Sequence, residues 1–209
     1  MANKETTKQI SPLALNNISY GLYVLSVKDG DKDNACIINT FTQVNNTNPT
    51  LFTISIGKHC YTHDMLKKTK VFNISVITKD ANFVFFKRFG FTSGRDKNKF
   101  SECKNIYRSS NGLIYIKREC NAYMSLEVTT SVDLDTHTLF TAKLVESVVL
   151  SDTPSVTYAD YHKHIKPKAN ANSTNYRCTI CNFILEAPQL PKDYVCPICN
   201  QGADAFVKT

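Results

Sequence analysis

Four cysteines near the C-terminus form two Cys-x-x-Cys pairs with the spacing of a metal site. Cys178 and Cys181 make the first pair, Cys196 and Cys199 make the second, and fourteen residues separate the pairs. Two such turns brought face to face offer four sulfur ligands in a tetrahedron, which suits Zn²⁺ or a single iron ion. Residues 176–209 are too few to fold well without a metal. We therefore predict a metal site, with four metal-free structural thiols as the weaker alternative.

The residues around these cysteines resemble those of rubredoxins. The resemblance runs from Tyr176 to Val207 and rests on the aromatic Tyr176, on Leu190-Pro-Lys-Asp-Tyr194, on Cys196-Pro-Ile-Cys199 and on Phe206. It implies one Fe²⁺/Fe³⁺ ion in the four-cysteine site, carrying one electron at a time, with zinc as the alternative. The apolar Ile180, Val195 and Ile198 flank the sulfurs, and an apolar cover that limits water favours electron transfer.

The sequence also departs from the rubredoxin pattern at two points. The loop between the cysteine pairs is shorter than in most rubredoxins, and Asn182 and Asn200 stand where glycine is common. Asparagine is the non-glycine residue that best tolerates a positive φ, so the turns remain feasible.

A second group of polar and basic side chains has the composition of a site for an anionic cofactor. Thr62 is expected to cap a helix over residues 63–70, and a helix N-terminus attracts phosphate. Lys58 and Lys99 add positive charge, and Arg95 can bind a phosphate with two parallel hydrogen bonds. The polar end of the segment 38–44 could meet the edge of a planar ring through Thr40, Thr42 and Gln43.

The segments that carry these residues resemble flavin reductase-like FMN-binding proteins over about residues 10–165. The matching motifs are Gly21-Leu-Tyr-Val-Leu25, Asn39-Thr-Phe-Thr-Gln-Val44, the turn at Pro49, Lys58-His-Cys-Tyr-Thr-His63, Phe89-Gly-Phe-Thr-Ser-Gly-Arg95 and Lys99-Phe100. The resemblance implies an antiparallel split β-barrel, usually a homodimer, that binds FMN. The residues it assigns to FMN are Ile38, Asn39, Thr40, Thr42, Gln43, Lys58, His59, Thr62, Arg95 and Lys99.

Simpler interpretations exist for several of these residues. Thr62 could be no more than a helix cap, Asn39 and Thr40 ordinary strand polarity, and Arg95 a solvated loop charge. His59 and His63 are better read as surface or cap residues than as proton donors. Cys36 and Cys60 lie near the same segments, and we expect buried spectators rather than redox thiols.

These sites must be positioned by a mainly β chain. Period-two alternation predicts half-buried strands over 51–56, 71–77 and 126–134. Further strands are expected over 20–27, 35–44, 113–116 and 139–150, with a turn at 28–33. Short helices are expected over 12–17, 63–70, 81–89 and 158–164, and Met65 and Leu66 should face inward. This pattern favours an antiparallel barrel or sandwich.

The chain divides into a barrel domain (1–165), a linker (166–175) and a small domain of the rubredoxin kind, built around metal-binding turns (176–209). The linker is small and polar without apolar periodicity. Fully extended, it spans at most about 33–36 Å. The small domain could therefore reach its own barrel or that of a sister subunit.

Charge and composition exclude several other classes. The chain carries a formal charge of +7, and the basic and acidic residues of 176–209 cancel, so the barrel carries the excess. GxGxxG, GxxxxGK[ST], HExxH and GxSxG motifs are absent from the sequence. We find neither a signal sequence nor a membrane-spanning segment, and expect a cytoplasmic protein. The basic residues are scattered, which argues against nucleic acid.

The whole chain resembles the high-molecular-weight rubredoxins, a family in which both parts occur together. The resemblance implies electron flow from NAD(P)H through FMN to the iron, and onward to a flavodiiron protein or a rubrerythrin-type reductase that removes O₂, NO or peroxide. One alternative is an electron carrier whose flavin is reduced by a separate reductase. Another, from a different class, is a zinc-ribbon protein whose barrel binds nucleic acid.

Overall fold

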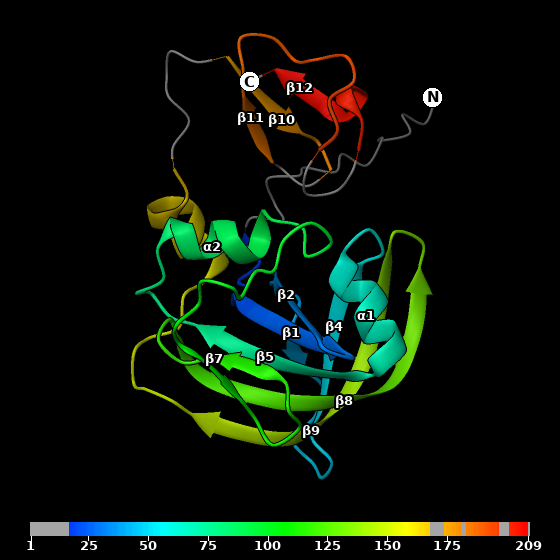
Figure 1. The fold of residues 1–209 in the computed structure, drawn as a ribbon, viewed down its shortest axis with the longest axis vertical. Coiled ribbons are helices and arrows are strands. Elements are labelled where there is room, and N and C mark those ends of the chain that lie inside the picture. The colour runs from blue at the N-terminus through cyan, green and yellow to red at the C-terminus, as the bar shows by residue number, and fades with distance from the viewer. Residues whose placement is uncertain (1–16, 168–173, 181–182, 197–200, 209) are drawn as a thin grey trace, which may run out of the picture.

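The computed structural model describes residues 17–167, 174–180, 183–196 and 201–208. Its main feature is one curved antiparallel sheet with strand order β2-β1-β5-β8-β9-β4-β3. Figure 1 shows the sheet with α1 and α2 packed against it and the C-terminal strands above α2. The strands of this sheet are β1 (Tyr23–Asp29), β2 (Lys32–Ile38), β3 (Thr42–Gln43), β4 (Leu51–Gly57), β5 (Val71–Ile77), β8 (Cys120–Leu134) and β9 (His137–Val149).

Among the described residues, four helical segments and two smaller sheets complete the fold. The helical segments are α1 (Tyr61–Thr69), α2 (Phe83–Gly90), α3 (Tyr158–Asp160), which runs into a π turn (Tyr161–Ile165), and a 3₁₀ turn (Ala203–Ala205). The smaller sheets are the hairpin β6 (Ile106–Arg108) with β7 (Ile114–Ile116), and the three-stranded sheet of β10 (Asn175–Cys178), β11 (Ile184–Glu186) and β12 (Phe206–Lys208). In the part of the chain that the structure describes, no helix has both the length and the apolar character needed to span a bilayer.

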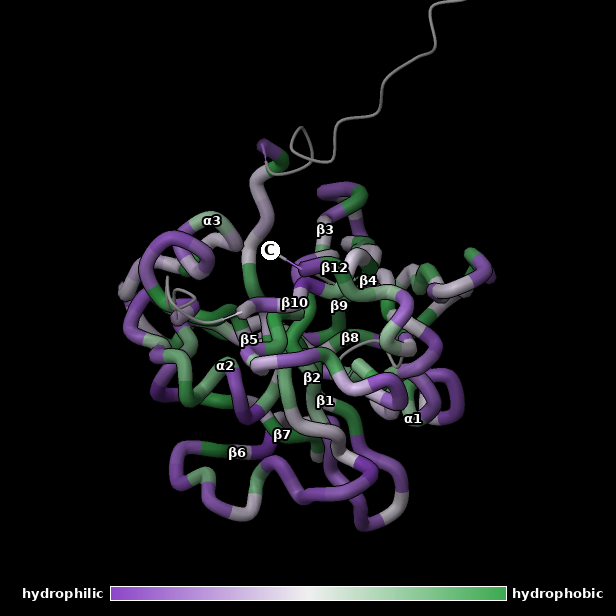
Figure 2. The backbone as a smooth tube through the Cα atoms, turned by 90° about the horizontal axis from the view of Figure 1, so that it is seen from above, coloured by the Kyte–Doolittle hydropathy of each residue, from purple (hydrophilic) through white to green (hydrophobic). Residues whose placement is uncertain are grey.

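The hairpin of β1 and β2 is buried on both faces. Leu25 and Val27 point into one hydrophobic cluster with α1, whereas Val24 and Ala35 point into a second cluster with α2. A strand covered on both sides reads as a continuous apolar run, as this one does. Figure 2 shows hydrophobic residues gathered along the central strands and hydrophilic loops around the rim.

The mainly β architecture predicted from the sequence is confirmed, and most elements lie where the periodicity placed them. The strand expected over 71–77 has those bounds, and Met65 and Leu66 are buried as expected. The turn expected over 28–33 shrinks to Gly30 and Asp31, because Asp29 pairs directly with Lys32. Gly30 has a φ of 57°, a conformation that suits glycine.

Several predictions of detail were wrong. The first helix begins at Tyr61 with Cys60 as its N-cap, so Thr62 lies inside the first turn and does not cap it. The second helix begins two residues late, because Asn82 caps it by accepting a hydrogen bond from the Phe85 N–H. Val132 and Leu134 are about half exposed, because β8 pairs with β5 only as far as Glu127 and its residues 129–134 extend beyond that strand with both faces exposed. The helix expected over 12–17 falls almost wholly outside the described residues.

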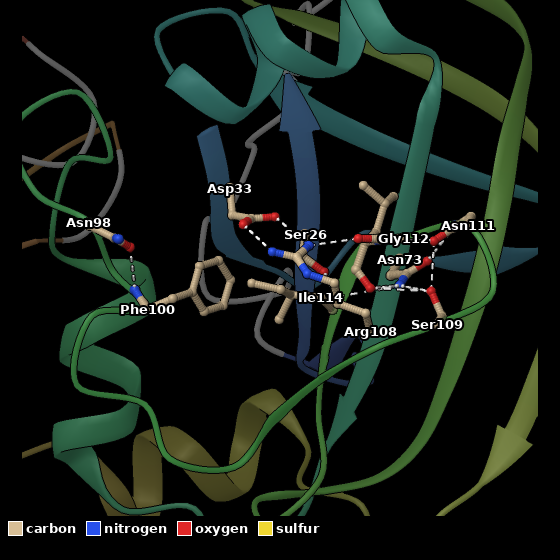
Figure 3. A network of polar contacts seen from close by, with 11 residues as sticks. Ser26, Asp33, Asn73, Asn98, Phe100, Arg108, Ser109, Asn111, Gly112 and Ile114 are labelled. Carbon is tan, nitrogen blue, oxygen red and sulfur yellow. Dashed lines mark hydrogen bonds and ion pairs between the residues drawn. The ribbon is translucent and has the colours of Figure 1, made fainter. Parts of the chain in front are cut away.

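A buried amide fastens the β6–β7 hairpin to the sheet. The Asn73 side chain, fully buried on β5, donates to Ser109 Oγ at 2.7 Å and accepts from Asn111 Nδ2 at 2.9 Å. At the same turn of the hairpin, Arg108 makes two parallel hydrogen bonds to Asp33 of β2, at 3.0 and 2.7 Å. Figure 3 shows both contacts converging on the hairpin. They hold the hairpin over the β1–β2 surface.

Replacing Asn73 with alanine should lower the free energy of unfolding by about 2–3 kcal/mol, because its buried hydrogen-bond partners would be left unsatisfied. Urea denaturation of the purified chain measures this difference. Asn46 is exposed, and Asn46→Ala is the control, with an expected change within about 0.5 kcal/mol. Equal stability of Asn73→Ala and wild type would contradict the assignment of the hairpin's anchor.

Candidate functional site

The C-terminal domain buries two of the predicted metal ligands in one small core. Cys178 closes β10 and Cys196 lies in the loop before the 3₁₀ turn, and both side chains are fully buried in a cluster with Phe206. The Cys178 N–H donates to the Phe183 carbonyl and the Cys196 N–H to the Gln201 carbonyl, each at 2.8 Å. The same backbone hydrogen bond, from a cysteine N–H to the carbonyl five residues later, thus occurs twice.

These residues fit a thiolate-bound metal by the chemistry of the donor set. Two buried sulfurs in a dry cluster suit a soft or borderline metal such as iron or zinc. Cys181 and Cys199 lie outside the described residues, so the structure describes two of the four predicted ligands. Within the described ranges, no three or more His, Cys, Asp or Glu side chains are grouped as for a metal ion.

The apolar cover of this core is aromatic. Ile180 and Val195, expected to flank the sulfurs, are 64% and 55% exposed, so their side chains lie largely in solvent. Ile198 lies outside the described residues. The cover comes instead from partly buried side chains packed on the cluster, namely Tyr176, Phe183, Leu185, Leu190, Tyr194 and Ala205.

The start of α1 and a neighbouring loop form a polar cradle. The buried Asn34 side chain on β2 donates to Thr62 Oγ1 at 3.0 Å, while its Oδ1 atom is the one buried side-chain oxygen or nitrogen without a partner among the described residues. Loop 92–95 closes over it so tightly that a Cβ at Gly94 would meet this oxygen at 2.0 Å. Arg95 lies beside the same helix, in an ion pair with Asp64. The helix start and the Arg95 guanidinium suit a small anionic group, whereas the unpartnered Asn34 oxygen is an acceptor and calls for a donor.

Farther along β2, an aromatic cavity of about 300 Å³ opens between the barrel and the C-terminal domain. Asn34 and Asn39 are five residues apart, or about 17 Å along an extended strand. The cradle lies on the α1 side of β2 and the cavity on the α2 side, so one elongated ligand would have to pass around this edge strand to reach both. The walls are mainly apolar, and the lining residues are Leu22, Ile37, Ile38, Asn39, Phe86, Gly90, Phe91, Tyr158, Tyr161, His162, Lys166 and Phe183.

The ten residues assigned to FMN from the sequence fall into three places. Ile38 and Asn39 line the cavity, and Thr62 and Arg95 lie at the cradle. The others lie elsewhere. Thr40 hydrogen-bonds both the N–H and the carbonyl of Ser55. Thr42 and Gln43 are exposed on β3, Lys58 pairs with Asp133 at 2.6 Å, and His59 contacts Cys60 at 3.5 Å.

Lys99 has a structural role in this arrangement. Its ammonium group is buried and donates to the carbonyls of Ala35 at 2.7 Å and Phe89 at 3.1 Å. Burial lowers the pKa of Lys99, and the neighbouring Cys36 and Cys60 oppose that shift. Lys99 therefore ties β2 to the end of α2, which holds the roof of the cavity in place.

Sequence reasoning missed the aromatic residues that build the cavity. Phe91 follows α2, Tyr158 and Tyr161 come from the α3 segment, and Phe183 comes from the C-terminal domain. The spacing of Tyr158 and Tyr161 was available as a signal, because it places both on one helical face. Nothing in the sequence links Phe183 to residues about ninety positions earlier.

Cys36 and Cys60 sit behind the cradle, where they pack against the barrel core. Burial, with smaller contributions from Cys36 and Asp64 and an opposing one from Lys99, raises the pKa of the Cys60 thiol to about 12. Burial also raises the pKa of Cys36. Thiols that stay protonated are poor nucleophiles.

Two family models match the chain. The flavin reductase like domain matches residues 15–168, and the rubrerythrin, rubredoxin-like domain matches residues 176–207. Together the two matches cover the residues that line the cavity and both cysteine pairs.

Two curated relatives match over most of their length. A high molecular weight rubredoxin of Moorella thermoacetica is 32% identical over 92% of this chain and 97% of the relative. A ferric-chelate reductase (NAD(P)H) of Archaeoglobus fulgidus is 30% identical over 78% of this chain and 95% of the relative.

Solved structures share the fold of the barrel. An NADH:FAD oxidoreductase of Streptomyces globisporus C-1027, in complex with NAD and FAD fragments, superposes with a TM-score of 0.64 at 17% identity, over 79% of this chain and 99% of that one. An FMN-binding protein of Thermus thermophilus gives 0.62 at 21% identity, over 75% and 91%.

Replacing Cys196 with serine should remove the metal from the C-terminal domain, because a hydroxyl is a poor substitute for a thiolate ligand. Elemental analysis of the purified chain should find about one metal ion per wild-type chain and much less in the variant. Cys103→Ser, at a half-buried barrel cysteine, is the matched control and should keep the metal. Full metal content in Cys196→Ser would contradict the site.

Alkylation should spare Cys60 in the folded chain. A pKa of about 12, against an ordinary 9.0, leaves the thiol protonated at pH 8. Labelling by iodoacetamide should be about a thousandfold slower than in the urea-unfolded chain, and should rise tenfold per pH unit as the thiolate forms. Peptide mapping by mass spectrometry gives the rate for each cysteine. Equal rates in the folded and unfolded chain would show that Cys60 is an accessible, ionised thiol.

Proposed function

Because the chain belongs to the flavin reductase-like family and is a homologue of high-molecular-weight rubredoxin, we propose that it passes electrons from NAD(P)H through FMN to one iron ion. Flavin-linked electron transfer by an oxidoreductase is the established part. The proposal adds the identity of the flavin, the nicotinamide donor and the order of transfer. The iron would be held by Cys178, Cys181, Cys196 and Cys199.

One observation carries the proposal, namely that a single cavity is walled by both domains. Asn39 of the barrel and Phe183 of the C-terminal domain line the same space, and the Phe183 carbonyl accepts the N–H of the ligand Cys178. A group bound in the cavity would thus be separated from a metal ligand by one side chain and one hydrogen bond. Short, packed routes of this kind suit electron transfer between two cofactors.

The chemistry requires that two electrons be divided. Bound FMN supplies that conversion, accepting a hydride and releasing electrons singly. The balance is one NAD(P)H and two Fe³⁺ giving one NAD(P)⁺, one H⁺ and two Fe²⁺. Each nicotinamide therefore reduces two ferric ions, one after the other.

The protein's own contribution is binding and shielding. The cradle at Asn34 and Thr62, with Arg95 beside it, would hold the FMN phosphate, and the aromatic walls would exclude water from the ring. Asn39 offers an amide to the ring edge. The excess positive charge of the barrel should attract both anionic nicotinamides and the anionic four-thiolate iron site.

We also propose that the chain forms a homodimer. Several valines and a leucine of the β8–β9 ribbon are exposed, which is typical of a surface that pairs with another chain; they are Val132, Leu134, Val145, Val148 and Val149. We propose a flavodiiron protein or a rubrerythrin-type reductase as the acceptor, on the strength of the relationship to high-molecular-weight rubredoxin.

Anaerobic titration with NADH or NADPH tests the electron path. Bleaching the visible bands of both the flavin and the ferric thiolate site should take about three nicotinamides for every two chains, because each FMN accepts two electrons and each Fe³⁺ one. If both nicotinamides leave the flavin oxidised while a protein reductase reduces it, the chain is instead an electron carrier served by another enzyme. A colourless chain with stoichiometric zinc and salt-sensitive DNA binding would favour the zinc-ribbon alternative.

A further inference from the structure

The aromatic cavity has one wall that belongs to the C-terminal domain. Among its described lining residues, Phe183 alone comes from that domain. The Phe183 ring lies 6.4 Å from the ring of Phe91 on the barrel side and 6.5 Å from that of Phe206 in the metal core, measured between ring centroids. One side chain therefore joins the cavity to the core that holds Cys178 and Cys196.

Apart from Phe183, the strand pairing and core packing described for the C-terminal domain lie within that domain. Its three strands pair only with one another, and the described residues of its core all come from positions 176–206. Its hydrogen-bonded turns at Cys178 and Cys196 close within the domain. Since its folding does not depend on the barrel's core, the domain can leave the barrel without losing its own structure.

The cavity that Phe183 closes is the natural entry for a second planar ring. Its remaining walls are aromatic and apolar, with Asn39, His162 and Lys166 as polar groups. That composition suits a nicotinamide, with an apolar wall for the ring, an amide for the carboxamide and a cation for a phosphate. Because Phe183 occupies one side of this cavity, a nicotinamide bound on that side would have to displace its ring.

We propose that Phe183 is a removable wall, so that the C-terminal domain and NAD(P)H compete for the same face of the cavity. Docked, Phe183 brings the ligand Cys178 next to the cavity for electron delivery to iron. Undocked, the same face is open to the nicotinamide. This inference rests on the proposed function and adds that hydride uptake and electron delivery alternate.

Phe183→Ala tests the proposal in the full-length, cofactor-loaded chain. Loss of the aromatic contact should lower the docked fraction about tenfold, a change equivalent to about 1.4 kcal/mol. Electron transfer to iron should slow by that factor in anaerobic stopped flow, while reduction of the flavin by NADH should be as fast as in wild type or faster. Phe183→Tyr should restore docking, and Val195→Ala, at an exposed residue of the same domain, is the matched control.

A second measurement does not depend on turnover. Oxidised NAD⁺ or NADP⁺ cannot donate a hydride but should displace Phe183, so hydrogen exchange at residues 90–92 and 183–185 should quicken in wild type. Phe183→Ala should show fast exchange without nicotinamide and bind NAD⁺ more tightly.

The outcomes separate this inference from the proposed function. If NADH reduces flavin and iron in Phe183→Ala at wild-type rates, the removable wall is wrong while the electron path stands. If nicotinamide binding leaves exchange at these residues unchanged or slower, or if NAD⁺ binds neither chain, the competition is also refuted. Wild-type flavin that NADH fails to reduce would instead overturn the proposed function.

Discussion

The double-sided burial of β2 is the constraint on which the candidate site depends. This strand is covered by one hydrophobic cluster on each face, and Lys99 ties Ala35 on it to Phe89 at the end of α2. A strand held in this way cannot shift register without exposing both cores. It therefore fixes the distance between the cradle at Asn34 and the cavity at Asn39, which a single elongated cofactor would have to bridge.

The two domains solve different stability problems. The barrel buries large apolar side chains in two clusters, and this burial stabilises it. The C-terminal domain has a core of only three buried described residues, two of them cysteines, so metal–sulfur bonds must supply most of what packing cannot. Because that domain is stabilised locally, its contact with the barrel can be weak and reversible, as alternating partners require.

The sequence predicted more of the chemistry than of its placement. The cysteine pairs, the strands over 51–56 and 71–77 and the inward face of α1 could be read from spacing and period. Thr62 was assigned to the wrong position in its helix. The Cys60 N–H donates to the Gly57 carbonyl, and this backbone turn starts the helix at Tyr61, two residues before the expected start and without a side-chain cap. From the sequence, Lys99 was expected to add positive charge to the flavin site, yet its buried ammonium group donates hydrogen bonds to the carbonyls of Ala35 and Phe89.

The sequence by itself determined the candidate cysteine ligands and the mainly β character, because these follow from residue type at short spacing, and its resemblance to known families indicated the flavin reductase-like and rubredoxin-like halves. The tertiary structure alone decided which aromatic side chains meet at the cavity and that Phe183 closes it. Contacts between residues about ninety positions apart depend on how two separately folded parts pack against each other, and local spacing carries no record of that packing.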